Sequence, residues 1–218
     1  MTVSGSDALH VEIDLRASLG GVRDQGTRNS CLSCAASDAH MHLHALTHAL
    51  SAEFLYHHAG LLMPGGNGTR GLSFSAVDQT LKLDGQPSEL ECPYQATDSN
   101  PWVPPNISKL WHGKLSDGAG QITEIVESVR QRQPVVIAIQ LTGDFLGVNS
   151  PPYIVATGGP AFGGHAVLAV GLGIDQSHGN LVLIRNSWGS GWGDSGHAWL
   201  ASDYLANNMI GFRKVALR

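Results

Sequence analysis

The chain has 218 residues, a net charge of −5 and 42% hydrophobic residues. This length suits one large domain, or two small lobes that share an interface, and it can bury a sizeable core. The lack of a basic run argues against a nucleic-acid partner, and no apolar stretch approaches the ~18 residues that a membrane span needs.

The amino-terminal residues and the cysteine count bear on location. Residues 1–6 do not resemble a signal peptide. The chain contains only three cysteines, Cys31, Cys34 and Cys92. A pairing of Cys34 with Cys92 is conceivable, but a reducing compartment is the simpler interpretation. We therefore expect a cytoplasmic protein, or a domain of something larger.

Helices are expected in the first half of the chain. A helix is predicted to begin at Cys31, with Ser30 as its N-cap, and to continue through Leu46. The reason is that neither Pro nor Gly occurs between Cys31 and Glu53. Further helices are predicted at 51–58, at 73–83, ending in an Asp-Gly pair, and at 122–131.

Strands are expected in the second half. The Pro-, Asn- and Gln-rich stretch 95–105 has the composition of a crossover between two parts of the molecule. The short apolar run 134–139 predicts a strand. Further strands, separated by glycine turns, are predicted around 165–170, 181–185, 197–200 and 212–217. The order of helices first and strands later predicts an α+β fold.

Three short motifs, far apart in the chain, carry the candidate chemistry. They are Gln25-Gly26-Thr27-Arg28-Asn29-Ser30-Cys31, Gly164-His165-Ala166-Val167, and Asn186-Ser187-Trp188-Gly189-Ser190-Gly191-Trp192-Gly193. A cysteine attacks a carbonyl well only as a thiolate, so it needs an imidazole to take its proton. The imidazole needs a third group to fix its tautomer, and an asparagine can serve.

These requirements predict the catalytic set Cys31, His165, Asn186 and Gln25. Cys31 would be the nucleophile, His165 the base and Asn186 the group that orients it. The amide of Gln25 would donate to the oxyanion beside the backbone N–H of Cys31. A helix N-terminus lowers a thiol pKa, so we expect that effect at Cys31. No cofactor and no metal ion are needed for this chemistry.

The three motifs, in this order, resemble those of the papain-like cysteine peptidases, from about Ile13 to the C-terminus. The resemblance implies one catalytic domain over 1–218, with a helical lobe at about 13–105 and a β-rich lobe at about 106–218. The second lobe would be an antiparallel, barrel-like sheet, and the active site would lie in the cleft between the lobes. The segment Ile13-Asp14-Leu15-Arg16 resembles the family's first strand.

The same resemblance implies a set of substrate-binding positions. Gly71 matches the glycine whose backbone pairs with an extended substrate. Trp188 would shield the bond between Asn186 and His165, and Gly164 stands where the family often has Asp or Asn. The positions implied to line a moderately apolar subsite are Leu72, Ser73, Ala138 and Ala166.

Two departures from the family pattern bear on regulation and stability. The start of the chain leaves no room for the family's inhibitory pro-segment, so an inhibitory or activating protein partner is expected in its place. Arg28 stands where secreted members begin a disulfide bridge. The expected partners of the chain are peptide or protein substrates and an inhibitory or activating protein.

Two side-chain groups allow a second interpretation. Cys31 and Cys34 form a CxxC motif, for which core packing of Cys34 is favoured over a role in resolving an oxidised Cys31. His40, His44 and His48 recur every four residues. Two such histidines can hold a metal ion, but no carboxylate or thiol companion is evident, so a solvated helix face is expected.

The expected activity is peptide-bond hydrolysis through a thioester acyl-enzyme, by default as an endopeptidase. One alternative uses the same site with an amine as acceptor, which would make a peptide ligase or transamidase. Another is a non-enzymatic peptide-binding module, disfavoured because all four catalytic residues are present. A thiol–disulfide oxidoreductase would leave Gln25, His165 and Asn186 unexplained.

Overall fold

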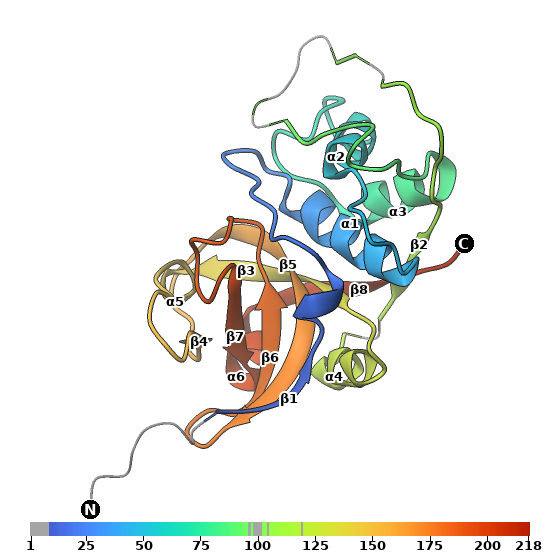
Figure 1. Cartoon of the computed structure of the whole chain (residues 1–218). Helices are drawn as coiled ribbons and strands as arrows, with labels where there is room; N and C mark the ends of the chain where they lie inside the picture. Colours follow the sequence, from blue (N-terminus) through green and yellow to red (C-terminus); the bar gives the residue numbers. More distant parts are fainter. Residues whose placement is uncertain (1–8, 96, 98–101, 104, 119) are drawn as a thin grey trace, which may run out of the picture.

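The structure is a computed structural model that describes residues 9–95, 97, 102–103, 105–118 and 120–218. Three helices gather in one half of the molecule and a curled, mostly antiparallel sheet forms the other (Figure 1). These helices are α1 (Cys31–Leu43), α2 (Ala52–Leu61) and α3 (Phe74–Leu83). Shorter helices are α4 (Ile122–Arg130), α5 (Gly143–Leu146), α6 (Ser202–Asn208) and the 3-10 turn η1 (Arg16–Ser18).

The sheet is organised around its longest strand, β5, which pairs antiparallel with β1, β3 and β6. The strand order is β2-β8-β3-β5-β6-β7-β4, with β1 added on β5. Among the strands that the structure describes, only the short β4 pairs in parallel, with β7. The strands are β1 (Leu9–Asp14), β2 (Lys114–Asp117), β3 (Val135–Thr142), β4 (Ile154–Val155), β5 (Ala161–Asp175), β6 (Gly179–Arg185), β7 (His197–Ala201) and β8 (Met209–Ala216).

Helix α1 lies between the other two large helices and the sheet (Figure 1). Its buried side includes Ala35, Ala36 and Ala39, whose small side chains allow a close approach of helix and sheet. Leu32 and Met41 extend this contact into the main core. Since α1 begins at Cys31, its packing fixes where that side chain stands against β5.

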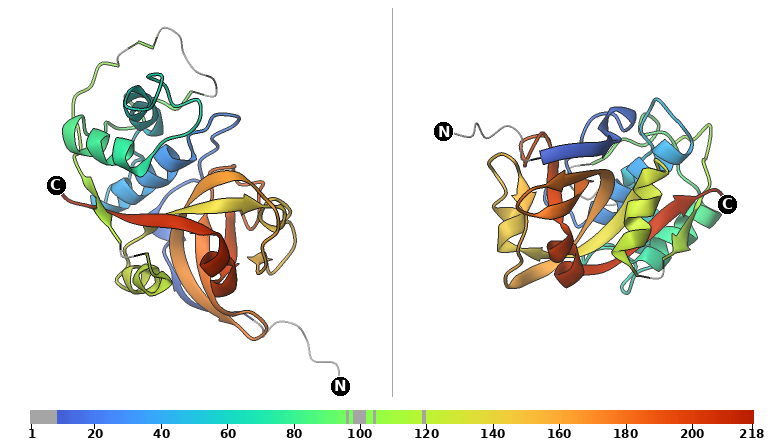
Figure 2. Two further views of the ribbon diagram at one scale, coloured as in Figure 1. Left: turned by 180° about the vertical axis from the view of Figure 1, so that it is seen from behind. Right: turned by 90° about the horizontal axis from the view of Figure 1, so that it is seen from below.

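Strands from both halves of the sequence join in this one sheet. Strand β1 comes before all the large helices, yet it pairs with β5. Strand β8 runs from α6 toward the helices and pairs there with β2 (Figure 2). These pairings confirm the predicted α+β fold. The division into lobes at residues 105 and 106 stays a prediction.

Several predicted boundaries differ from the structure. Helix α1 ends at Leu43 and does not continue through Leu46 as predicted, because the backbone turns at Ala45, which has φ of 48°. Ser30 occupies the N-cap position, but its hydroxyl bonds the Tyr94 hydroxyl at 2.6 Å instead of capping the helix. The predicted first strand ends at Asp14, where a 3-10 turn follows.

Other elements carried no recognised signal. Strands β2 and β4 and helices α5 and α6 were not predicted, since each is short and lacks a clear period. The predicted crossover at 95–105 lies partly outside the described residues. Within the part of the chain that the structure describes, no helix has the length and apolar character to cross a membrane.

Candidate active site

The loop that carries Gln25 lies directly beside the motif that begins at Asn186. The backbone N–H of Gln25 donates to the Ser187 carbonyl at 2.8 Å, and Gly189 N–H donates to the Arg23 carbonyl at 2.9 Å. The Ser187 hydroxyl also donates to Gln25 Oε1 at 2.6 Å. Two predicted motifs that are about 160 residues apart are thus joined by backbone and side-chain hydrogen bonds.

The contact with Ser187 orients the Gln25 amide. Because Oε1 accepts from that hydroxyl, Nε2 faces the opposite side, where it donates to the Arg28 carbonyl at 2.6 Å. Gln25 is only 7% exposed. An amide nitrogen carries two hydrogens, and one of them is used in this loop. The predicted role of Gln25 as an oxyanion donor would use the other hydrogen.

Cys31 is the first residue of α1 and lies at the junction with β5. The backbone N–H of Ala166, the residue after His165, lies close enough to the Cys31 thiol to favour its charged form. Burial raises the pKa of this thiol, and the N–H groups of Ala166 and Leu32 only partly oppose the shift. Desolvation therefore outweighs the expected lowering of the thiol pKa by the helix N-terminus. The expectation was wrong for a Cys31 thiol without a charged partner.

His165 and Asn186 form the hydrogen bond that the sequence predicts. His165 Nε2 lies 2.8 Å from Asn186 Oδ1, and both residues are buried. The Ser187 backbone N–H also donates to Asn186 Oδ1 at 2.8 Å, so this atom must be the amide oxygen. His165 Nε2 is consequently the donor. In neutral His165, Nδ1 therefore carries the lone pair that can accept a proton.

The electrostatics of His165 follow from its surroundings. Burial lowers its pKa to about 4, although the hydrogen bond to Asn186 opposes this shift. Among the described residues, Asn186 Nδ2 has no hydrogen-bond partner. The isolated imidazole is thus neutral at pH 7, in the tautomer that a general base requires.

Aromatic side chains cover this hydrogen bond. The Trp188 ring lies 4.6 Å from the His165 ring, between centroids, and Trp192 packs edge-on against Trp188. Phe145, fully buried, contacts the rings of His165, Trp188 and Trp192. Phe145 was not predicted as a site residue, because a single phenylalanine between glycines gives no periodic signal.

The predicted substrate positions fall in two neighbouring groups. Ala138 and Ala166 are register partners on β3 and β5, and Gly164 lies two residues before Ala166 on the same strand. Gly71 lies beside the Asn29 carbonyl and has φ of +91°, which favours glycine. Leu72 and Ser73 follow it and lead into α3, where the Ser73 hydroxyl accepts the N-cap hydrogen bond from Ala76.

A strand contact links these two groups. Ala138 also pairs with Gly211 on β8. A side chain at Gly211 would contact the Phe74 ring at 4.0 Å, and Phe74 is the first residue of α3. The start of α3 therefore faces the strands that carry Ala138 and Ala166.

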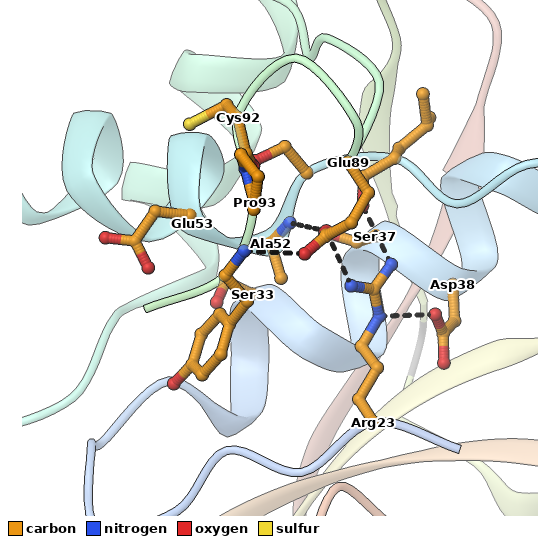
Figure 3. A network of polar contacts seen from close by, with 12 residues as sticks. Arg23, Ser33, Ser37, Asp38, Ala52, Glu53, Glu89, Cys92 and Pro93 are labelled. Atoms are coloured by element: carbon orange, nitrogen blue, oxygen red, sulfur yellow. Dashed lines mark hydrogen bonds and ion pairs between the residues drawn. The ribbon is translucent and has the colours of Figure 1, made fainter. Parts of the chain in front are cut away.

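A buried carboxylate joins the segments that carry the site. Asp38, on α1, accepts from Arg23 Nε at 2.7 Å and from Arg185 Nε at 2.7 Å. Arg23 precedes Gln25 by two residues, and Arg185 directly precedes Asn186. Glu89 accepts from the other side of Arg23 at 3.0 Å, as Figure 3 shows. One side chain thus fixes the relative positions of three chain segments.

Arg28 makes a second buried ion pair. Its guanidinium donates to both carboxylate oxygens of Glu53, at 2.5 and 3.1 Å, and lies over the rings of Tyr56 and Tyr94. Glu53 belongs to α2, so this pair ties the Gln25–Cys31 loop to that helix. It does so at the position where the resemblance implies a disulfide in secreted enzymes.

The three free thiols differ in exposure. Cys31 is partly exposed, whereas Cys34 is 2% and Cys92 6% exposed. Burial raises the pKa of Cys34 to about 12, and it also raises that of Cys92. Cys34 packs among core residues, which supports the packing interpretation of the CxxC motif. Its proposed role in resolving an oxidised Cys31 stays untested.

We predict that iodoacetamide modifies Cys31 at least tenfold faster than the other two thiols at pH 7. His165→Ala should slow the modification of Cys31, because burial then leaves a neutral thiol without a base. Peptide mass spectrometry over time measures both rates. Faster labelling of Cys34 or Cys92 would contradict the choice of nucleophile.

Comparisons with known proteins agree with this geometry. The family model described as papain family cysteine protease matches residues 9–216. The chain is 31% identical over 198 residues to a pro-cathepsin H of Medicago truncatula, covering 87% of this chain and 55% of that protein. It is also 31% identical over 156 residues to a cathepsin L-like proteinase of Fasciola hepatica, covering 70% of this chain and 46% of that protein. The chain thus spans about half the length of these two curated relatives.

Solved structures show the same fold. Xylellain, a cysteine protease from Xylella fastidiosa, superposes with a TM-score of 0.79 at 24% identity, covering all of this chain and 91% of that one. Digestive procathepsin L 3 of Tenebrio molitor gives 0.78 at 25% identity, over 99% of this chain and 72% of that one. Bromelain from Ananas comosus, solved in complex with the E64 inhibitor, gives 0.76 at 21% identity, over 94% and 98%.

Proposed function

Because the chain belongs to the papain family of cysteine proteases, we propose that it hydrolyses peptide bonds through Cys31, His165 and Asn186. The observation that carries this proposal is the fixed tautomer of His165. The Ser187 N–H fixes the oxygen of Asn186, and that oxygen accepts the His165 Nε2 hydrogen at 2.8 Å. Nδ1 is the nitrogen left to take the thiol proton.

The first step is proton transfer from the Cys31 thiol to His165 Nδ1. Burial disfavours a lone thiolate and a lone imidazolium alike. The two charges therefore form together, and their mutual attraction offsets the desolvation. The thiolate then attacks the substrate carbonyl carbon, and the carbonyl π electrons move to oxygen. This oxyanion accepts hydrogen bonds from the Cys31 N–H and the free hydrogen of Gln25 Nε2.

The second half of the cycle returns the proton. The imidazolium of His165 protonates the leaving amine as the C–N bond breaks, which leaves a thioester on Cys31. Water then attacks the thioester while His165 Nδ1 takes one of its protons. The C–S bond breaks, the carboxylic acid product leaves, and the proton returns to sulfur. Trp188 and Trp192 would keep bulk water from the His165–Asn186 bond.

The proposed substrate is an extended peptide that runs along Gly71. The positions proposed to line its subsite are Leu72, Ser73, Ala138 and Ala166, none of which carries a charge. This supports a preference for a moderately apolar residue over Arg or Lys in that subsite. Endopeptidase activity is the default form of the proposal.

The experiment that tests this function is digestion of a peptide library, read by mass spectrometry, with and without added amine. Hydrolysis predicts new carboxylate termini that carry ¹⁸O when the reaction is run in H₂¹⁸O. A ligase or transamidase would instead form new amide bonds with the amine. A peptide-binding module would give neither product, although peptides would bind.

We expect Gln25→Ala to lower turnover by about 10²–10³-fold, because it removes one oxyanion donor. Alkylation of Cys31 involves no oxyanion, so its rate with iodoacetamide should change little. Steady-state hydrolysis and thiol-modification rates measured on the same preparation check this prediction. Equal losses in both rates would mean that Gln25 supports Cys31 structurally, through its bonds to Ser187 and Arg28.

Two further expectations belong to this proposal. A reducing, cytoplasmic location is supported by the free state of Cys31, Cys34 and Cys92. Control by an inhibitory or activating protein partner is also proposed. Bromelain was solved with the E64 inhibitor, and we expect the same compound to inactivate this chain.

A further inference from the structure

Two histidine rings meet where α1 ends. His40 Nε2 lies 3.1 Å from His44 Nε2, and the ring centroids are 4.8 Å apart. His40 is fully buried and His44 is partly exposed. The expectation of a solvated helix face was therefore wrong for His40. The helix ends at Leu43, and the segment around Gly113 packs against the His40 ring.

The tautomer of His40 is fixed by its neighbours. The Gln86 amide nitrogen donates to the Ser51 carbonyl at 2.7 Å and to the Ser37 hydroxyl, so the Gln86 oxygen faces His40. His40 Nδ1 lies 2.9 Å from that oxygen and must donate to it. Nε2 of neutral His40 therefore carries a lone pair, and this lone pair faces His44.

This arrangement matches the outer shell of many metal sites. A histidine that binds a metal through one nitrogen usually donates the other N–H to an oxygen, which fixes the ring and its tautomer. Gln86 takes that position for His40. Gln86 is itself fully buried and held on two further sides, so the Nε2 lone pair of His40 is oriented in advance.

The distance between the two nitrogens also fits a shared ion. Two imidazoles bound to one metal at about 2.0–2.1 Å have nitrogens about 2.9–3.4 Å apart, for angles between about 90° and 109°. The observed 3.1 Å falls within that range. The His112 carbonyl oxygen is 3.3 Å from His44 Nε2 and can supply a third donor. We propose that His40 and His44 form a binding site for a divalent first-row transition-metal ion of the Zn²⁺ type.

Two imidazoles would be the side-chain ligands of this site. Over the described ranges, no group of three or more His, Cys, Asp or Glu side chains is arranged to hold a metal ion. The His112 carbonyl and water would complete the coordination. When the metal ion binds, a neutral His44 ring would lose its Nε2 proton to solvent and gain a proton at Nδ1. Metal binding to this ring would therefore release no net proton.

The site is separate from the catalytic residues. His40 is nine residues after Cys31 on α1, which corresponds to about 13 Å along the helix axis. A bound ion would join the end of α1 to the segment at His112, which leads into β2. Because this geometry exists only in the folded chain, the ion would stabilise the protein by binding to the native state.

The test titrates Zn²⁺ into the Cys31→Ala chain by calorimetry, since this background lacks the thiolate that would bind zinc in the active site. One saturable site is expected. His44→Gln, at a partly exposed position, should weaken its affinity at least tenfold. His42→Gln is the matched control, because His42 lies only two residues before His44, in the last turn of α1, but bonds Ser18 and the Arg132 carbonyl. It should change the affinity less than twofold.

A second measurement does not depend on a variant. With ¹⁵N-labelled histidine in the Cys31→Ala chain, one equivalent of Zn²⁺ should shift the Nε2 resonances of two histidines, and both rings should then carry their proton at Nδ1. No saturable binding, or unchanged binding in His44→Gln, would overturn the proposal. The 3.1 Å contact would then be a hydrogen bond from His44 to His40.

Discussion

Cys31→Ala should lower peptide hydrolysis by about a millionfold, which is the loss seen when a protease loses its nucleophile. The side chain is partly exposed at the first turn of α1 and lies at the border of the core, so the change to alanine removes only one sulfur atom from that border. The fold should therefore survive, with a thermal midpoint close to that of the wild type. Hydrolysis of a fluorogenic peptide and a thermal melt on the same sample measure both properties.

Cys92→Ala is the matched control for this prediction. Cys92 is also a free cysteine, but it is buried at 6% exposure, and its carbonyl accepts from Ser51 of the α2 N-terminus. Its replacement should leave kcat within about twofold of wild type. Activity that persists in Cys31→Ala but disappears in Cys92→Ala would show that Cys31 is not the nucleophile.

Asp38→Asn should lower the free energy of unfolding by about 3–5 kcal/mol, as expected when one partner of a buried ion pair is removed. The Asp38 side chain is only 7% exposed and serves two arginines at once. Burial alone would lower the pKa of Arg23, and the charge of Asp38 is the largest influence that raises it instead, so the variant leaves this buried guanidinium without its main counter-charge. Urea denaturation at pH 7 gives the change directly.

Asp14→Asn provides the comparison for Asp38. Asp14 also pairs with an arginine, Arg16, but both side chains are about one-third exposed. Exposed pairs contribute about 0–1 kcal/mol, so this variant should change the unfolding free energy by no more than that. Equal changes in the unfolding free energy would mean that the buried ion pairs of Asp38 contribute no more than an exposed pair. Asp38 would then not hold together the loop of Gln25, α1 and the strand before Asn186.

The residues of the candidate site were predictable because each of them lies in a short sequence motif. Gln25, Cys31, His165 and Asn186 each lie in a short motif whose residue types fit one proposed chemical role. The structure brings His165 to Asn186, and Gln25 to the neighbouring Ser187, by hydrogen bonds. The order of helices and strands was also predictable from periodicity and from the placement of Gly and Pro.

What could not be predicted depends on contacts between distant segments. The burial of His40 follows from the segment near Gly113, more than seventy residues away. The role of Asp38 depends on two arginines that are far from it in the sequence. The pKa of Cys31 is set by desolvation, which a helix-end argument cannot include. Local sequence patterns give no information about these contacts between distant segments.

The pairing of β1 with β5 has a consequence for dividing the molecule. Residues 9–14 lie in the sheet, and the chain returns to the sheet at β2 only after all three large helices. In sequence, the helices are thus an insertion between two strands of one sheet. A fragment cut at the predicted lobe boundary near residue 105 would carry β1 without its partner and leave β5 with an open edge. Reassembly of the two fragments would therefore require strand exchange as well as docking of the helices.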